Sequence, residues 1–236
     1  MTAPVDAAQV RAVAFDCFGT LIDWQAGILS ALHALLERHR VTAAPADDEL
    51  LAMYAEFEQN AQAGEYKPYR QVLTQVTQRF AGKLGFPLPV MDRDILADSI
   101  RHWPAFDDTG TVLRRLKATH KIAIISNIDD DLFERVAPRL GIGGTAGLDA
   151  LVTAEQVRSY KPGHAHFLTL VERLGFDRSE VLIAACSKHH DIAPANELGF
   201  PTCWIDRRQR GASGNAEAEP SMTVRSAAEL ADTLSC

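Results

Sequence analysis

The stretch Val13-Ala14-Phe15-Asp16-Cys17-Phe18-Gly19-Thr20-Leu21 decides the fold. Three apolar residues lead into one carboxylate, which is followed closely by a Gly-Thr turn. A short apolar run bounded by turn residues is typical of a buried strand. Asp16 then lies just past the carboxyl end of that strand, where open α/β sheets build their sites. Such a carboxylate either caps the turn or acts as a covalent nucleophile, and this stretch alone favours neither.

Apolar strands alternate with helices from Trp103 onward. The strands are expected at Lys121–Ser126, Leu151–Thr153, Val181–Cys186, Thr202–Ile205 and Met222–Val224. The helices between them are expected at Thr109–Thr119, Leu132–Leu140, His164–Leu174 and Ile192–Leu198. Residues 211–216 are expected to form a flexible loop. This alternation predicts an α/β fold whose parallel sheet carries helices on both faces.

The segment between the first strand and this alternating region is rich in helical patterns. Its apolar residues recur at helical spacing, as in Ile28, Leu32 and Leu35. One strand before a helical block cannot fold alone, so the strand belongs to the later sheet. We therefore expect a core of residues 11–21 and 104–236, with a helical cap at 22–103 inserted after the first strand. Such a cap can close over the sheet's carboxyl end and exclude water.

Composition excludes several classes of function. The 236 residues are 47% hydrophobic and carry a formal net charge of -7, and no Lys/Arg cluster is present, so nucleic acid is not an expected partner. No apolar run is long enough for a membrane span, and the N-terminus lacks the pattern of a signal peptide. The four cysteines, at positions 17, 186, 203 and 236, form no C-x-x-C pair. We expect reduced thiols and a cytoplasmic location.

Polar residues recur where the expected strands end. Asp16 follows the first strand, Ser126-Asn127 end the second, and Asp191 lies in the loop after Val181–Cys186. Lys161 lies in the loop before the helix at His164. One such residue is usually only solvated, but carboxyl ends of parallel strands meet at one edge of the sheet. The ordered set predicts a single catalytic site for a small-molecule substrate.

Asp16, Ser126, Lys161 and Asp191 resemble, in order, the four motifs of the haloacid dehalogenase superfamily. The resemblance implies a Rossmann-like core with an inserted cap. It makes Asp16 the nucleophile that forms a covalent ester, steadied by Thr20. Lys161 would offset the negative charges of the site, and Asp191 would orient either water or Lys161 for hydrolysis of the ester.

The residue two places after Asp16 separates the branches of this superfamily. Phosphatases resemble D-x-D there and hold Mg²⁺, whereas this chain has Phe18. The sequence resembles the 2-haloacid dehalogenase branch, which uses no metal or other cofactor. The resemblance implies that the backbone N–H groups of Cys17 and Phe18, with Ser126, hold the carboxylate of a small 2-haloalkanoic acid. Asn127 would face the departing halide, Phe18 and Trp24 would form apolar walls, and the cap could support a homodimer.

Several residues depart from the pattern of that branch. Its members carry a halide-binding arginine in the cap, but residues 51–57 contain none and include Glu56; Arg70 is a candidate substitute. Phe167 replaces an expected tyrosine, and Lys188 replaces an expected asparagine. An Mg²⁺-dependent phosphatase and a non-catalytic member of the superfamily therefore remain alternatives.

Three further clusters need an interpretation. His164 and His166 resemble a metal pair but open a helix from different sides, so no metal site is expected there. His189-His190, beside Asp191, could shuttle a proton, although packing is the simpler interpretation. The run Asp129-Asp130-Asp131 is interpreted as a helix start, where acidic residues match the helix dipole.

Overall fold

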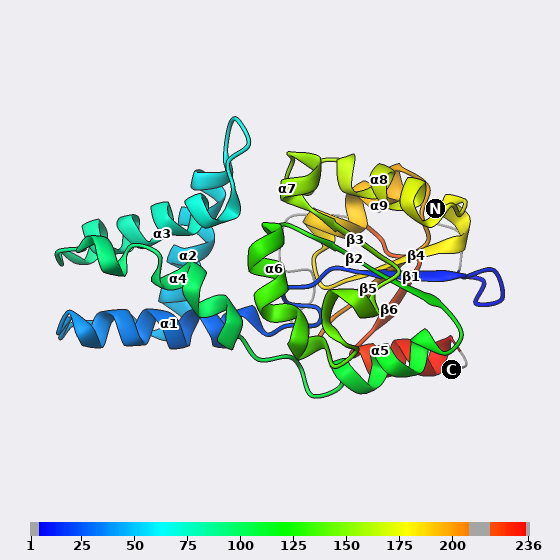
Figure 1. Cartoon of the computed structure of the whole chain (residues 1–236), viewed down its shortest axis with the longest axis horizontal. Helices are drawn as coiled ribbons and strands as arrows, with labels where there is room; N and C mark the ends of the chain where they lie inside the picture. Colours follow the sequence, from blue (N-terminus) through cyan, green and yellow to red (C-terminus); the bar gives the residue numbers. More distant parts are fainter. Residues whose placement is uncertain (1–4, 208–217, 235–236) are drawn as a thin grey trace.

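The computed structural model describes residues 5–207 and 218–234; the expected loop at 211–216 and Cys236 lie outside them. Six strands form one parallel sheet in the order β3-β2-β1-β4-β5-β6. The strands are β1 (Ala12–Phe15), β2 (Lys121–Ser126), β3 (Ala150–Thr153), β4 (Val181–Ala185), β5 (Thr202–Ile205) and β6 (Met222–Val224). The predicted doubly wound α/β fold is confirmed (Figure 1).

Alternate residues of β1 point to opposite faces of the sheet, and each face has its own helices. Val13 and Phe15 pack in the cluster that contains α5, α6 and α10 side chains, whereas Ala12 and Ala14 pack with side chains of α8 and α9. The helices of the core are α5 (Thr109–Lys117), α6 (Asp130–Val136), α7 (Ala154–Val157), α8 (Ala165–Leu174), α9 (Ala193–Glu197) and α10 (Ala227–Thr233). Burial on both faces explains why the strands are continuously apolar.

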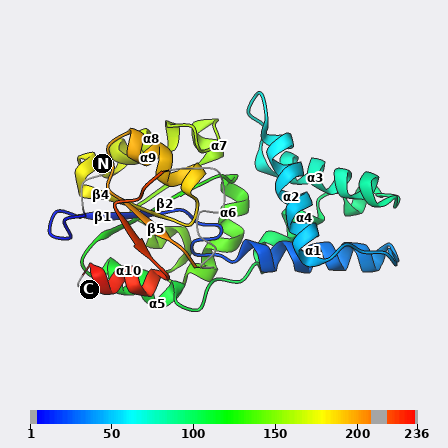
Figure 2. The same cartoon turned by 180° about the vertical axis from the view of Figure 1, so that it is seen from behind.

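The segment after β1 forms a group of helices beside the sheet, on the side to which the strands' carboxyl ends point (Figure 1 and, from behind, Figure 2). Its helices are α1 (Trp24–Arg38), α2 (Asp47–Gln62), α3 (Tyr69–Leu84) and α4 (Ile95–Ser99), with 3-10 turns at Val90–Asp92 and Ile100–His102. We call this segment, residues 22–103, the insert. Its apolar side chains belong to the same hydrophobic cluster as one face of the sheet. Its division from the core at 22 and 103 stays a prediction.

Some helix boundaries differ from the expected ones. The helix expected at Leu132–Leu140 begins earlier, at Asp130, and changes to a 3-10 turn at Ala137–Leu140, which contains Pro138. The helix expected at Ile192–Leu198 follows a π-helical turn at Lys188–Ile192. Such turns are frequent at functional sites, and this one contains Asp191. Further 3-10 turns lie at Gly144–Gly147 and Arg178–Glu180. Across the described ranges, no helix combines the length and the apolar character needed to cross a bilayer.

Candidate active site

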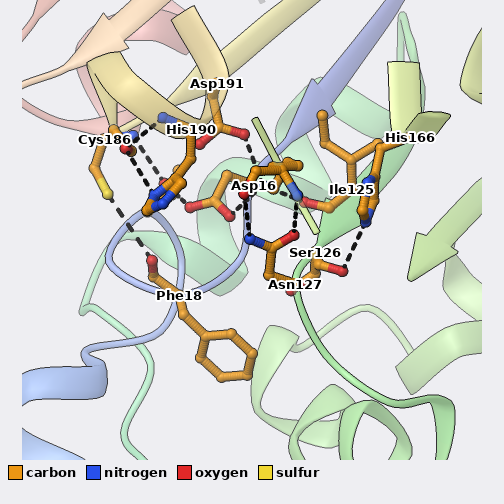
Figure 3. Close-up of polar contacts among 12 residues, drawn as sticks. Asp16, Phe18, Ile125, Ser126, Asn127, His166, Cys186, His190 and Asp191 are labelled. Carbon is orange, nitrogen blue, oxygen red and sulfur yellow. Dashed lines mark hydrogen bonds and ion pairs between the residues drawn. The ribbon is translucent and has the colours of Figure 1, made fainter. Parts of the chain in front are cut away.

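The carboxyl ends of β1, β2 and β4 bring the expected polar residues together (Figure 3). Asp16 follows β1, Ser126 ends β2, and Asp191 lies in the π-helical turn after β4. Since the chain returns from the edge strand β3 to β4, next to β1, the strand order reverses beside Asp16. Ligands of doubly wound sheets bind at this type of crevice.

Both carboxylate oxygens of Asp16 accept a hydrogen bond. Oδ2 accepts one from Thr20 Oγ1 at 2.8 Å, and Oδ1 accepts one from Lys161 Nζ at 2.9 Å. Thr20 Oγ1 also accepts the backbone N–H of Cys186 at 3.0 Å, which fixes the hydroxyl to the end of β4. Asp16 is only 7% exposed, so its carboxylate is oriented and largely removed from water.

Lys161 lies between the two carboxylates of the site. Its Nζ is 2.6 Å from Oδ1 of Asp191 and 2.9 Å from Oδ1 of Asp16, and it also donates to the carbonyl of Ile125 at 3.0 Å. Burial alone would lower the pKa of Lys161, but Asp16 and Asp191 raise it above its ordinary value. The lysine is therefore a permanent cation that separates two like charges.

Burial raises the pKa of the Asp191 carboxyl, and the negative charge of Asp16 adds to this while Lys161 opposes it. Oδ2 of Asp191 and Oγ of Ser126 are buried, and neither has a hydrogen-bond partner within the described part of the chain. A buried polar atom without a partner costs about 1–3 kcal/mol. These two atoms are therefore the ones most ready to accept a bond from, or donate one to, a substrate or water.

Asn127 forms hydrogen bonds that the sequence did not indicate. Its Oδ1 accepts the backbone N–H of Lys161 at 2.7 Å, and its Nδ2 donates to the carbonyl of the same residue at 3.1 Å. This pair of bonds holds the lysine backbone against the end of β2. One Nδ2 hydrogen remains after these bonds, and the expected contact of Asn127 with substrate stays a prediction.

The turn that carries Asp16 is closely packed. The carbonyl of Cys17 accepts N–H bonds from Leu21 and Ile22, at 2.8 and 3.0 Å. Gly19 has φ +91°, and a Cβ at this position would lie 2.7 Å from the Cys186 sulfur and 3.1 Å from Trp24 Nε1. Only glycine therefore fits this turn. The substrate contacts expected of the Cys17 and Phe18 N–H groups stay predictions.

Aromatic rings of the insert close over this turn. The half-buried Phe18 packs edge-on against Trp103, with ring centroids 5.2 Å apart. Trp24, whose Nε1 lies beside Gly19, has its ring 5.5 Å from that of Tyr54. These rings form an apolar boundary between the insert and the nucleophile turn, and the expected contact of Phe18 and Trp24 with substrate stays a prediction.

The donor set does not fit a magnesium ion. The position that would carry a second carboxylate is Phe18, and Lys161 Nζ fills the space between Asp16 and Asp191. Ser187, in the fourth motif, hydrogen-bonds to His190. In the described ranges, no group of three or more His, Cys, Asp or Glu side chains could hold a metal ion.

The two histidines at the start of α8, His164 and His166, lie in different environments. His164 pairs on the surface with Glu197 at 2.9 Å, whereas His166 is buried, with Nε2 3.3 Å from the Ser126 carbonyl. Burial lowers the pKa of His166 to about 3, and the charge of Lys161 contributes. His166 is therefore a neutral donor that supports Ser126 from behind. The pattern at 164 and 166 gave no indication of this role.

The residues that depart from the dehalogenase pattern have surroundings of other kinds. Arg70 contacts Asp131 at 2.6 Å and Asp98 at 3.8 Å, so its guanidinium is engaged by carboxylates, and Glu56 is exposed. Lys188 lies 4.5 Å above the ring of Trp204. Phe167 is buried in the core against Phe200.

A haloacid dehalogenase-like hydrolase family model matches residues 10–184. The chain belongs to this family. It is 30% identical over 172 residues to an (S)-2-haloacid dehalogenase of Pseudomonas fluorescens, covering 72% of this chain and 74% of that protein.

Two solved structures of the family share this fold. An L-2-haloacid dehalogenase from Xanthobacter autotrophicus with covalently bound chloropropionic acid superposes with a TM-score of 0.79 at 20% identity, covering 96% and 98% of the two chains. A putative HAD-hydrolase, YfnB from Bacillus subtilis, bound to magnesium, also gives 0.79, at 18% identity and 96% and 99% coverage. A dehalogenase and a magnesium-bound hydrolase therefore share this architecture. The fold does not distinguish their activities, so the function of this chain has to be argued from its site residues.

Proposed function

We propose that this hydrolase cleaves the carbon–halogen bond of small 2-haloalkanoic acids through a covalent ester on Asp16. The observation that carries the proposal is the buried Asp16 carboxylate, held by Thr20 and Lys161, with Phe18 in place of a second acid. A desolvated and oriented carboxylate is suited to attack a carbon atom. The (S)-2-haloacid dehalogenase relative supports this choice of substrate.

In the first step, an oxygen of Asp16 attacks the α-carbon of the substrate. The carbon–halogen bond breaks, and its electron pair leaves with the halide. Ser126 Oγ, which is buried without a partner within the described residues, would bind the substrate carboxylate. The remaining Nδ2 hydrogen of Asn127 would face the halide, because Arg70 is held by Asp131 and Asp98.

In the second step, water attacks Cγ of Asp16, the carbonyl carbon of the ester. The bond between this carbon and the ester oxygen breaks, and that oxygen takes up a proton and leaves as the hydroxyl of the product. Asp191 would accept the proton of this water through its unpartnered Oδ2. Lys161 would stabilise the negative charge that develops on the ester oxygen. The products are the 2-hydroxy acid, a halide ion and a proton, and Asp16 is regenerated as a carboxylate.

The first test is halide release from chloro-, bromo- and fluoroacetate and from both 2-chloropropionate enantiomers, with EDTA present. We expect release by the wild-type chain and none by Asp16→Asn. Asp16→Asn should keep the circular dichroism of the fold, because asparagine has the size of aspartate and Lys161 keeps Asp191 as an ion-pair partner. Full-rate release by Asp16→Asn would contradict covalent catalysis.

The same preparation distinguishes the alternatives. A chelator-sensitive phosphatase would release phosphate from small esters with Mg²⁺ but no halide. A non-catalytic member would release neither. The poor fit of the site to Mg²⁺ favours the dehalogenase, and we propose that no metal or other cofactor takes part. The cytoplasmic location and the homodimer stay predictions.

A further inference from the structure

Asp129 connects the catalytic core to the insert. It lies three residues after Ser126, immediately before α6, and is only 3% exposed. Its carboxylate makes no capping bond to its own helix. Instead, Oδ1 accepts the N–H of Tyr69 at 2.7 Å, and Oδ2 accepts the N–H of Arg70 at 2.8 Å.

These two N–H groups belong to the first residues of α3, in the insert. The first N–H groups of a helix have no partner within the helix, and the helix dipole favours a negative charge beside them. The residue that precedes α3, Pro68, has no capping side chain. A buried carboxylate from another part of the chain therefore completes the helix, and both of its oxygens are used.

The loop that carries Asp129 also builds the catalytic site. The buried Ser126 hydroxyl has no hydrogen-bond partner among the described residues, and Asn127 holds the backbone of Lys161 through two hydrogen bonds. Asp129 follows two residues later. A short segment thus has the active site on one side and the insert on the other.

The start of α3 continues into the wall of the insert that faces the nucleophile turn. The hydroxyl of Tyr69 lies 2.9 Å from that of Tyr54, and both donate to Glu58. The Tyr54 ring contacts Trp24, whose Nε1 lies beside Gly19. Contacts therefore connect the start of α3 to side chains next to the turn that carries Asp16.

We infer that Asp129 is a positioning residue that holds the insert in its closed place over the active site. The expected effect on substrate turnover rests on the proposed function. The expected effect on the position of the insert rests only on the hydrogen bonds of Asp129. Loss of Asp129 would populate open forms in which the site is incomplete. An apparent affinity is reduced by the fraction of binding-competent molecules, whereas saturating substrate restores the closed form. The expected effect is a raised KM at nearly unchanged kcat.

The neighbouring aspartates provide a matched control. Asp131 is exposed and pairs with the guanidinium groups of Arg70 and Arg135, so it touches the same region through side chains only. Surface pairs of this kind contribute little. Asp131→Ala should leave KM within about two-fold of the wild-type value, whereas Asp129→Ala should raise it about ten-fold or more.

Kinetics of the two variants form the first part of the test. Asp129→Asn is included because it keeps the volume of the side chain if Asp129→Ala folds poorly; its amide can accept only through its single oxygen. A raised KM with kcat within about three-fold supports the inference. A lowered kcat at unchanged KM indicates loss of folded enzyme and overturns it.

Amide hydrogen exchange forms the second part and needs no substrate. In Asp129→Ala, peptides covering residues 69–73 and the Gly19–Ala26 region should exchange about ten-fold faster than in the wild type and in Asp131→Ala. Faster exchange at 69–73 alone would make Asp129 a local cap and overturn its positioning role. Unchanged exchange at both places overturns the inference even if halide release is observed. Absent halide release with faster exchange at both places would refute only the proposed substrate.

Discussion

The ammonium group of Lys161 lies 2.6 Å from Oδ1 of Asp191, and both side chains are at most 2% exposed. The same ammonium group contacts Asp16 at 2.9 Å. One cation therefore compensates two buried carboxylates, so its removal affects both folding and chemistry. A buried ion pair that loses one partner is destabilised by about 3–5 kcal/mol, because an uncompensated charge remains.

Lys161→Met should abolish detectable halide release and lower the free energy of unfolding by about 3–5 kcal/mol. The double variant Lys161→Met/Asp191→Asn should regain part of this stability, because one of the stranded carboxylates becomes neutral, but it should stay inactive. Urea unfolding of the single and double variants measures both effects. Equal stability of the two variants would contradict the idea that Lys161 separates two charges.

Asp191→Asn should slow hydrolysis of the ester more than its formation. An asparagine keeps the size of the side chain but cannot accept the proton of the attacking water. We expect the ester to accumulate on Asp16 and to appear in intact-mass spectra as a gain equal to the mass of the substrate acid less that of the hydrogen halide. Asp16→Asn is the control that should never carry this adduct. An unmodified Asp191→Asn protein that still releases a burst of halide would refute this division of roles.

The pH dependence of kcat should report Asp191. Burial raises the pKa of this carboxyl to about 7, and Asp16 adds to the shift while Lys161 opposes it. The carboxyl accepts a proton only when it is ionised, so hydrolysis should slow as the pH falls through this value and level off above it. Steady-state rates at saturating substrate between about pH 5 and 9 measure this profile. A rate that is constant across this range would show that another group takes the proton.

Two glycines of the insert should respond in opposite directions to alanine. A Cβ on Gly27, in α1, would lie 2.3 Å from the Trp103 ring, whereas no atom of the described residues lies within 4 Å of a Cβ on Gly82, in α3. Gly27→Ala should lower the free energy of unfolding by about 1–3 kcal/mol through overpacking. Gly82→Ala should raise it by about 0.5–1 kcal/mol, because alanine favours the helix. Thermal or urea unfolding of the two variants is the measurement, and a Gly27→Ala protein at least as stable as the wild type would contradict the close packing of Gly27 against Trp103.

Sequence patterns predicted the sheet well because its strands are buried on both faces. β2, β5 and β6 begin and end at the predicted residues, and β3 begins one residue earlier, at Ala150. Apolar character along the strand is a local property, so it can be seen in the sequence. The four residues expected in one site are also brought together, because the order of parallel strands fixes which ends meet.

Contacts between distant segments could not be predicted in this way. The run Asp129–Asp131 starts a helix, as predicted, because Asp129 precedes α6 and Asp130 and Asp131 lie in its first turn. The sequence did not indicate that the Asp129 carboxylate accepts backbone N–H groups of α3, or that Asp130 accepts a bond from Thr153. Arg207 is a second case: it donates to the Thr20 carbonyl at 2.7 Å and pairs with Asp108. No periodicity in the sequence identifies the partner of a charged side chain that lies 60 or more residues away.

The contact between Phe18 and Trp103 restricts how this branch of the family can evolve. Phe18 separates the two chemistries of the superfamily, yet its ring also packs against the residue at which the chain leaves the insert. Phe18→Asp alone would place a carboxylate against the indole of Trp103 instead of giving a second acid free to act. A lineage that moves from carbon–halogen to phosphate-ester substrates must therefore rebuild this junction before, or together with, the change at position 18. The residue at position 18 is then difficult to exchange by a single substitution.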